Sequence, residues 1–248
     1  MQQTQDLAAW TSGRSLKNLR RIAGASLMLA GVLFVWAFVA QYILPAPGLT
    51  TESLLQYIAE YRSFFIVSYA LFTAANSLSI VGALGIYVVT RVWDRSYAML
   101  GAGTLVVGFT VVLLSSTAPA LITLSDAYSA AAGNVVSQQA LAIAAEAVTA
   151  TNNPLIASSF IGVGVIFVSL AMMRGVYGRG LPYLGFFVGA LNIVRGLPPL
   201  GGYSIVTATF VAVSSVWIFW VGRRIYKEGQ RPRKPLHCAA EPRPSVEV

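Results

Sequence analysis

The residues best placed to do chemistry lie in the apolar stretch LGFFVGALNIVRGLPPLGG, residues 184–202. Asn192 and Arg195 stand there among apolar side chains, and because they are three apart they share one face of a helix. A charged side chain at the centre of a bilayer costs at least about 2.5 kcal/mol on insertion scales, so it is kept where it finds a partner or a water-filled cavity. The pattern therefore predicts a polar site around Arg195.

Acidic residues that could neutralise Arg195 are expected at the outer edge of the protein. Asp126 closes the outer end of the third apolar run, and Glu52, Glu60 and Glu146 fall in connecting segments. Asp126 is the preferred partner because it adjoins an apolar run and should lie at a comparable depth. An arginine–carboxylate pair can be bidentate, and it is strong where the dielectric constant is low.

Two interpretations of this polar group stay open. In the first, Arg195 binds an anionic or carbonyl group of a small or lipid-like ligand in an outward-facing pocket, which Gln41, Asn76 and Ser115 help to line. In the second, the arginine pairs with Asp126 to tether two helices, or reaches the lipid headgroups. Serine and asparagine side chains then serve as hydrogen-bonding contacts between helices.

The residues that usually carry catalysis or hold cofactors are missing from the apolar runs. The one histidine is His237 and the one cysteine is Cys238, both near the C-terminus, so a histidine-ligated haem or a buried zinc site is not expected. No serine has a nearby histidine to activate it, and no HExxH pattern or phosphate-binding glycine loop is present. We therefore expect no catalytic residues, no metal and no cofactor, and a membrane enzyme acting on a lipid-soluble substrate is the least favoured class.

The elements that must position these residues are long apolar runs. Of the 248 residues 56% are hydrophobic and 10% are charged, whereas soluble domains carry about 25% charged residues. About 20 apolar residues in a helix cross a hydrocarbon core of about 30 Å. The sequence predicts an all-α integral membrane bundle of six transmembrane helices, over residues 22–44, 64–90, 97–124, 155–173, 182–196 and 203–221.

Small residues and prolines add local detail to these helices. Pro119 is expected to kink the third run. Gly185 and Gly189 are four apart, a spacing that lets another helix backbone approach closely. Two outer amphipathic connectors are predicted. The first covers residues 48–63, where Thr50 or Thr51 can cap a short helix on the membrane surface, and the second covers residues 137–149.

Three parts of the chain follow from this layout: a basic, flexible or interfacial arm over residues 1–21, a transmembrane domain over 22–222, and a basic, proline-rich, disordered tail over 223–248. Fifteen of the 17 lysines and arginines fall on one side of the six runs, so both termini are predicted to be cytoplasmic. Because the basic residues flank apolar runs and form no continuous stripe, a nucleic-acid partner is not expected.

The run RRIAGASLMLAGVLFVWAFV and the later GLPYLGFFVGALNI resemble corresponding segments of a bacterial family of six-span membrane proteins catalogued only as a domain of unknown function. The resemblance covers residues 19–227 in layout and these two runs in residues. It implies six spans in a bacterial cytoplasmic (inner) membrane. It implies no activity, no cofactor and no catalytic residue.

The leading functional hypothesis is a non-enzymatic membrane protein that binds a small or lipid-like ligand, or a membrane partner protein, in an outer-half pocket near Arg195. The alternative is a small-molecule transporter or permease subunit, in which the broken end of the fifth span and the glycine-rich second and third spans provide movement. In both cases the lipid bilayer is the first partner.

Overall fold

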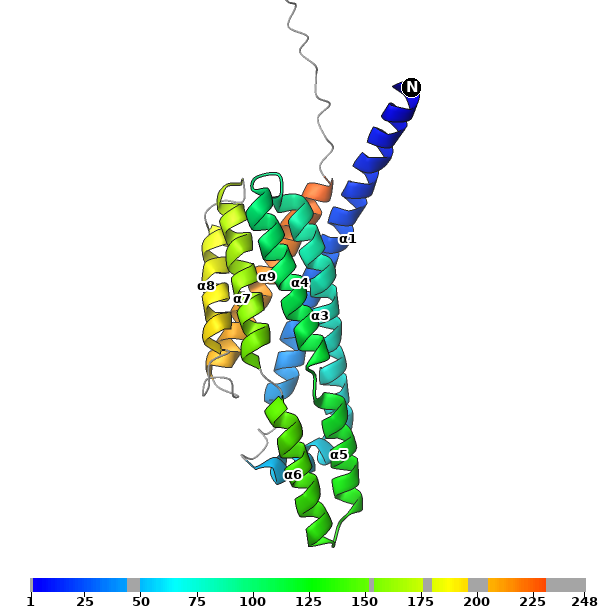
Figure 1. The fold of residues 1–248 in the computed structure, drawn as a ribbon, viewed down its shortest axis with the longest axis vertical. Helices are drawn as coiled ribbons and strands as arrows, with labels where there is room; N and C mark the ends of the chain where they lie inside the picture. The colour runs from blue at the N-terminus through cyan, green and yellow to red at the C-terminus, as the bar shows by residue number, and fades with distance from the viewer. Residues whose placement is uncertain (1, 44–49, 152–153, 176–179, 196–204, 231–248) are drawn as a thin grey trace, which may run out of the picture.

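The computed structural model describes residues 2–43, 50–151, 154–175, 180–195 and 205–230, with side chains for 16–39, 50–150, 156–175, 180–194 and 209–230. Within these ranges every regular element is an α-helix, and no strand occurs. The fold class predicted from the sequence, all-α, is therefore confirmed. Figure 1 shows two groups of helices, one above the other along the long axis of the molecule.

The larger group is a ring of six helices. In ring order each helix packs against the next, and the last returns to the first. The order is α1 (Gln2–Ile43), α3 (Arg62–Thr90), α4 (Arg95–Leu114), α7 (Pro154–Met173), α8 (Gly180–Arg195) and α9 (Ile205–Gln230). Large apolar side chains fill the inside of the ring, among them Leu105, Phe109, Met172, Val188 and Trp217.

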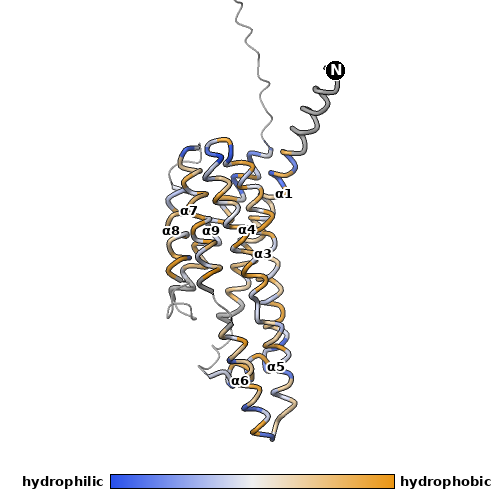
Figure 2. The backbone as a smooth tube through the Cα atoms, viewed as in Figure 1, coloured by the Kyte–Doolittle hydropathy of each residue, from blue (hydrophilic) through white to orange (hydrophobic). Residues whose placement is uncertain are grey.

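Four helical segments are long and apolar enough to cross a membrane. They are Leu16–Val39, Arg62–Thr90, Arg95–Ala130 and Ile156–Met173. Their outer faces expose large apolar side chains such as Trp36, Val67 and Leu100. Figure 2 shows hydrophobic colour along the ring helices and hydrophilic colour at the end that holds the α3–α4 turn. Such a surface matches contact with lipid chains, because soluble monomers rarely expose wide apolar patches.

Glycines hold neighbouring ring helices at very short range. A Cβ atom added at Gly24 of α1 would lie 2.8 Å from the carbonyl oxygen of Gly222 on α9, and the reverse distance is also 2.8 Å. Gly162 of α7 and Gly189 of α8 face each other in the same way, at 2.6 and 2.8 Å. Real Cβ atoms essentially never come this close to another atom, so these crossings require glycine. The close approach of a helix backbone is confirmed at Gly189, whereas a Cβ atom at Gly185 would meet the side chains of Ser169 and Trp217.

The smaller group, which we call the cap, consists of α2 (Thr51–Glu60), α5 (Ala118–Ala130) and α6 (Val135–Thr151). It lies at the end of the ring opposite to the α3–α4 turn and the start of α1 (Figure 1). The first predicted connector contains α2, whose N-cap is Thr50, the hydroxyl of which accepts from the backbone N–H of Ser53 at 3.3 Å. The second corresponds to α6.

Three sequence-based boundaries differ from the structure. The third run is not one helix over 97–124, because α4 ends at Leu114 and α5 starts at Ala118, with Pro119 in its first turn. Proline lacks a backbone N–H, and the first turn of a helix has no use for that donor, so the expected kink is a break between two helices. The N-terminal arm is helical from Gln2, and α9 continues to Gln230; residues 231–248 of the predicted tail lie outside the described residues.

The glycine contacts give a direct stability prediction. Gly162→Ala should lower the melting temperature of the detergent-solubilised protein, because its methyl group would meet the backbone of α8, and overpacking costs about 1–3 kcal/mol. Gly103→Ala is the matched control: a Cβ there meets nothing within 4 Å, and alanine favours helix over glycine. Equal melting temperatures for Gly162→Ala and the native protein would contradict the packing role.

Candidate functional site

The cap has a hydrophobic core of its own. Leu55 and Ile58 of α2 are fully buried against Leu121 and Tyr128 of α5 and Ala145 of α6. Leu55 and Ile58 are three apart, so they occupy one face of a short helix. This face was expected to lie on the membrane surface; in the structure it packs against α5 and α6 instead.

A bidentate ion pair fastens the cap to the ring. Nε of Arg62, in the first turn of α3, donates to Oδ1 of Asp126 on α5 at 2.9 Å, and Nη2 donates to Oδ2 at 2.9 Å. The two side chains are about half exposed, so solvent and salt weaken their attraction. The fork geometry makes the contact directional, since both carboxylate oxygens are engaged.

A buried hydrogen bond joins α5 to α2 beside this pair. The hydroxyl of Ser125, which is fully buried, donates to the backbone carbonyl of Leu55 at 2.7 Å. The next residue, Asp126, pairs with Arg62 of α3. Two consecutive residues of α5 therefore attach it to two different helices, and together they orient the cap.

The structure does not support Asp126 as the partner of Arg195. Asp126 bonds Arg62 through both oxygens, so the carboxylate preferred on grounds of depth serves another arginine. The error came from placing Asp126 at the end of a membrane helix, whereas it lies on α5, beyond the break that follows α4. Arg195 is the last residue of α8, and its side chain lies outside the described residues.

The other predicted site residues lie on different helices. Asn76 on α3 and Asn192 on α8 are both buried, and α3 and α8 are not neighbours in the ring. Each amide donates to its own helix, Asn76 to the carbonyl of Phe72 at 2.8 Å and Asn192 to that of Val188 at 3.4 Å.

Ser115 and Gln41 complete the predicted set. Ser115 is the C-cap of α4, half-buried at the break before α5. Gln41 lies in α1, and its side chain is outside the described residues. The described part of the chain thus does not gather Asn76, Asn192 and Asp126 into one place.

The surface that sequence reasoning missed is the outward face of α6. Five of its eight exposed residues follow a four–three–four–three spacing: Val136, Ala140, Ile143, Ala147 and Ala150. The other three are Val135, Gln139 and Glu146, which lie along one edge of the same face. We call the five regularly spaced residues the α6 stripe. The opposite face of α6 already packs in the cap core through Leu141, Ala145 and Val148. The spacing was present in the sequence, but the interpretation of 137–149 as an amphipathic segment did not identify which residues face outward.

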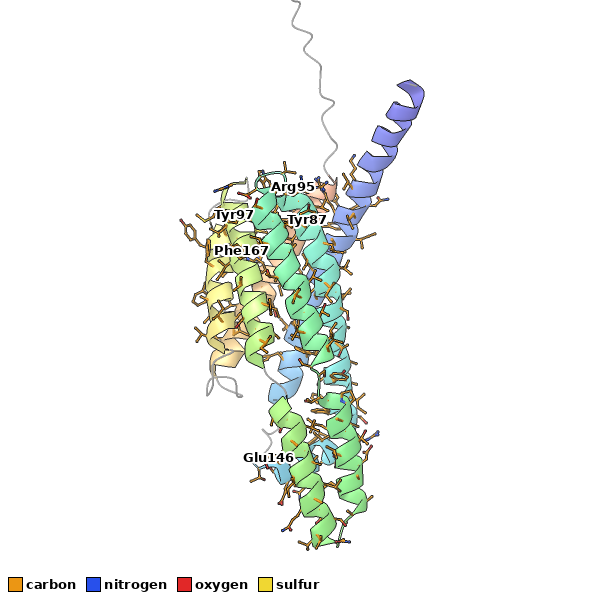
Figure 3. The ribbon with its side chains drawn as sticks, viewed as in Figure 1. Tyr87, Arg95, Tyr97, Glu146 and Phe167 are labelled. Atoms are coloured by element: carbon orange, nitrogen blue, oxygen red, sulfur yellow. The ribbon has the colours of Figure 1, made fainter. Side chains whose placement is uncertain are left out.

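The charges of the cap are acidic. Its three helices carry Glu52, Glu60, Asp126 and Glu146 and no lysine or arginine. Glu146 is exposed on α6, at the end of the molecule opposite to Arg95 (Figure 3). Within the described residues no group of three histidine, cysteine or acidic side chains is placed to hold a metal ion.

A second polar cluster lies at the other end of the ring, between α4 and α7. Asp94 caps α4 by accepting from the backbone N–H of Tyr97 at 3.0 Å and also pairs with Arg174. The Arg174 guanidinium lies 5.2 Å from the centre of the Tyr97 ring, which stacks on Phe167 (Figure 3). Every member is accounted for by capping, pairing or stacking, so this cluster is a joint between helices.

No family model, curated protein or solved structure was found to match this chain. The resemblance to a bacterial family of six-span membrane proteins therefore stays a prediction from the two quoted runs.

The ion pair predicts a specific change in the dynamics of the cap. Asp126→Asn should raise hydrogen exchange of the α5 backbone amides, measured by mass spectrometry, because the Arg62 guanidinium loses its charged acceptor. Glu146→Gln, which removes an exposed carboxylate from the same hairpin, should leave α5 exchange unchanged. The exchanged pair Arg62→Asp with Asp126→Arg should recover part of the protection, and unchanged exchange in Asp126→Asn would refute the fastening role.

Proposed function

We propose that this protein is a non-enzymatic integral membrane protein whose ring anchors the cap outside the bilayer as a binding module. In this proposal the six ring helices each cross a bacterial inner membrane, with both termini in the cytoplasm. The cap then faces the outer side. It binds a membrane partner protein or a lipid-like ligand, and the partner protein is the better supported of the two.

Helix lengths support this placement of the cap. At about 1.5 Å per residue, the 20 residues of α4 match a hydrocarbon core of about 30 Å. The 13 residues of α5 add about 20 Å beyond that thickness. The basic residues support the orientation, because they gather at the end of the ring opposite to the acidic cap.

The observation that carries the proposal is the α6 stripe. Val136 is 77% exposed and Ile143 is 67% exposed, on a helix that lies outside the ring. Fully burying a side chain of this size is worth about 1.5–3 kcal/mol. Association with a binding partner that covers the stripe would be stabilised by this free energy.

Binding is favoured over transport by the inside of the ring. Large apolar side chains occupy it, including Leu105, Phe109 and Trp217, and the buried amides of Asn76 and Asn192 each bond their own helix. A transport path would need polar groups connected along its length. The pocket near Arg195 remains a separate prediction for a small or lipid-like ligand, with the side chain of Arg195 outside the described residues.

The orientation can be tested by cysteine labelling. In a Cys238→Ser background, Gln56→Cys and Ser129→Cys place thiols on exposed cap positions, and Ser96→Cys places one on the opposite end. A membrane-impermeant maleimide should label the two cap cysteines in spheroplasts and Ser96→Cys after lysis alone. The reverse labelling pattern would show the opposite orientation, with the cap in the cytoplasm, and would refute this part of the proposal.

The binding role can be tested by a protection experiment on the α6 stripe. Ile143→Cys should react with a small maleimide more slowly in native membranes than in the purified, detergent-solubilised protein, because the partner is lost on purification at high dilution. Ser129→Cys, exposed on α5 away from the stripe, should react at similar rates in both. Equal rates for Ile143→Cys in both preparations would refute the proposed binding face.

A further inference from the structure

Basic segments of α1 and α9 meet at one corner of the ring, where the end of α9 lies beside α1 (Figure 1). The two helices run antiparallel: Gly24 lies against Gly222, and a Cβ atom at Gly229 would lie 3.0 Å from Cγ of Arg21. This close packing brings six cations together. We call them the basic corner: Lys17, Arg20 and Arg21 of α1, and Arg223, Arg224 and Lys227 of α9.

The positive charge of the basic corner is not neutralised by the described part of the chain. The two ion pairs found in the described residues lie elsewhere, at the cap and at the joint between α4 and α7. Glu228 is the one carboxylate in the adjoining turns, residues 16–30 and 216–230. Nε of Arg20 is buried and has no hydrogen-bond partner among the described residues. The corner therefore offers more donors than acceptors, which suits an anion.

The outward face of α9 changes from apolar to basic within one turn. Val216 and Trp220 are exposed, and Arg223 and Lys227 follow them at three- and four-residue spacing on the same face. The Arg223 guanidinium lies 4.9 Å from the centre of the Trp220 ring, a distance at which the ring attracts the cation. Tryptophan and basic residues at the end of an apolar face are typical of the depth at which lipid headgroups lie.

Helix α1 has the same boundary at a similar depth. Ile22 and Leu29 are exposed and apolar, and Asn18 stands one turn before Ile22 on the same face. The contact of Gly24 with Gly222 aligns this boundary with that of α9. A lipid that touches both helices would thus place its acyl chains on apolar side chains and its phosphate against the arginines.

A phosphate carried by a lipid fits the basic corner better than a free phosphate ion. A free ion would engage the arginines alone, whereas a phospholipid also covers the exposed apolar faces beside them. Guanidinium groups bind phosphate oxygens in pairs, and basic clusters at a membrane surface attract anionic lipids. A zwitterionic lipid would bring a second cation to a corner where Glu228 is the one carboxylate, so a lipid of net negative charge is favoured.

We propose that the basic corner binds the phosphate group of an anionic phospholipid, with the acyl chains against the outer faces of α1 and α9. This site lies on the ring and goes beyond the binding role proposed for the cap. It rests on the ring lying in a bilayer. The cap can fail its own tests without changing this inference.

Lipid binding to the purified full chain tests the site. In native mass spectrometry the detergent-solubilised protein should retain palmitoyl-oleoyl phosphatidylglycerol in preference to the phosphatidylcholine with the same chains. Arg21→Gln combined with Arg224→Gln should weaken phosphatidylglycerol binding about tenfold, because two guanidinium groups that bind phosphate are lost. Equal binding of the two lipids by the native protein would overturn the proposal, whether or not the double variant folds.

A matched double variant separates this site from general attraction by charge. Arg91→Gln combined with Arg95→Gln removes the same charge from exposed positions at the α3–α4 turn, on the same end of the molecule, and should keep the native affinity. Arg21→Lys combined with Arg224→Lys should recover part of the binding. Equal loss in the two glutamine variants would show that net charge alone attracts the lipid, and would overturn the site.

Thermal unfolding distinguishes the lipid from a free anion. Arg21 and Arg224 are exposed, so replacing both with glutamine should change the melting temperature little without added lipid. Phosphatidylglycerol should raise the melting temperature of the native protein and not that of this variant, because a ligand that binds the folded state stabilises it. An equal rise with inorganic phosphate would assign the corner to a free anion and overturn the lipid site. The reactivity of Ile143→Cys, which tests the cap, is independent of both results.

Discussion

Close backbone contact at glycine is the constraint on which the ring depends. Water drives apolar surfaces together, but lipid does not drive membrane helices together, so their association relies on van der Waals packing and hydrogen bonds. Gly24 with Gly222 brings the first ring helix against the last, and Gly162 with Gly189 joins α7 to α8. Gly101 of α4 similarly lies against the backbone of Gly164 and Val168 on α7. The ring closes because side chains are missing where its helices cross.

The cap begins where α4 ends. Together the 20 residues of α4 and the 13 residues of α5 would extend about 50 Å, and the chain continues beyond the ring as α5 and α6. These two helices bury one face of α2 between them. Because the resulting core is small, the cap is held in place by Arg62–Asp126 and by the bond from Ser125 to Leu55.

The sequence predicted the helices better than their partners. Long apolar runs identify α3 and α7 within a few residues, since hydropathy is a local property. Capping is local too, and of the two candidates Thr50 and Thr51 the structure has Thr50 as the N-cap of α2. In the sequence, Pro119 indicated an interruption of the third apolar run, but it did not show where α4 ends and α5 begins. The sequence analysis paired Asp126 with Arg195, whereas the structure pairs it with Arg62. Arg62 lies 64 residues away in the chain, and the one guide to a partner was the expected depth of each residue along its predicted span.

The two ends of the molecule differ in the sign of their charged side chains. At one end Asp94 and Arg174 fasten α4 to α7, among many further basic residues; at the other, Arg62 is the one cation that the cap contacts through an ion pair in the described residues. Once Arg62 is paired, the rest of the cap surface combines acidic side chains with an uncharged α6 stripe. Acidic side chains repel anionic lipids, so a surface of that composition favours apolar contact with the stripe over adsorption to a charged bilayer surface.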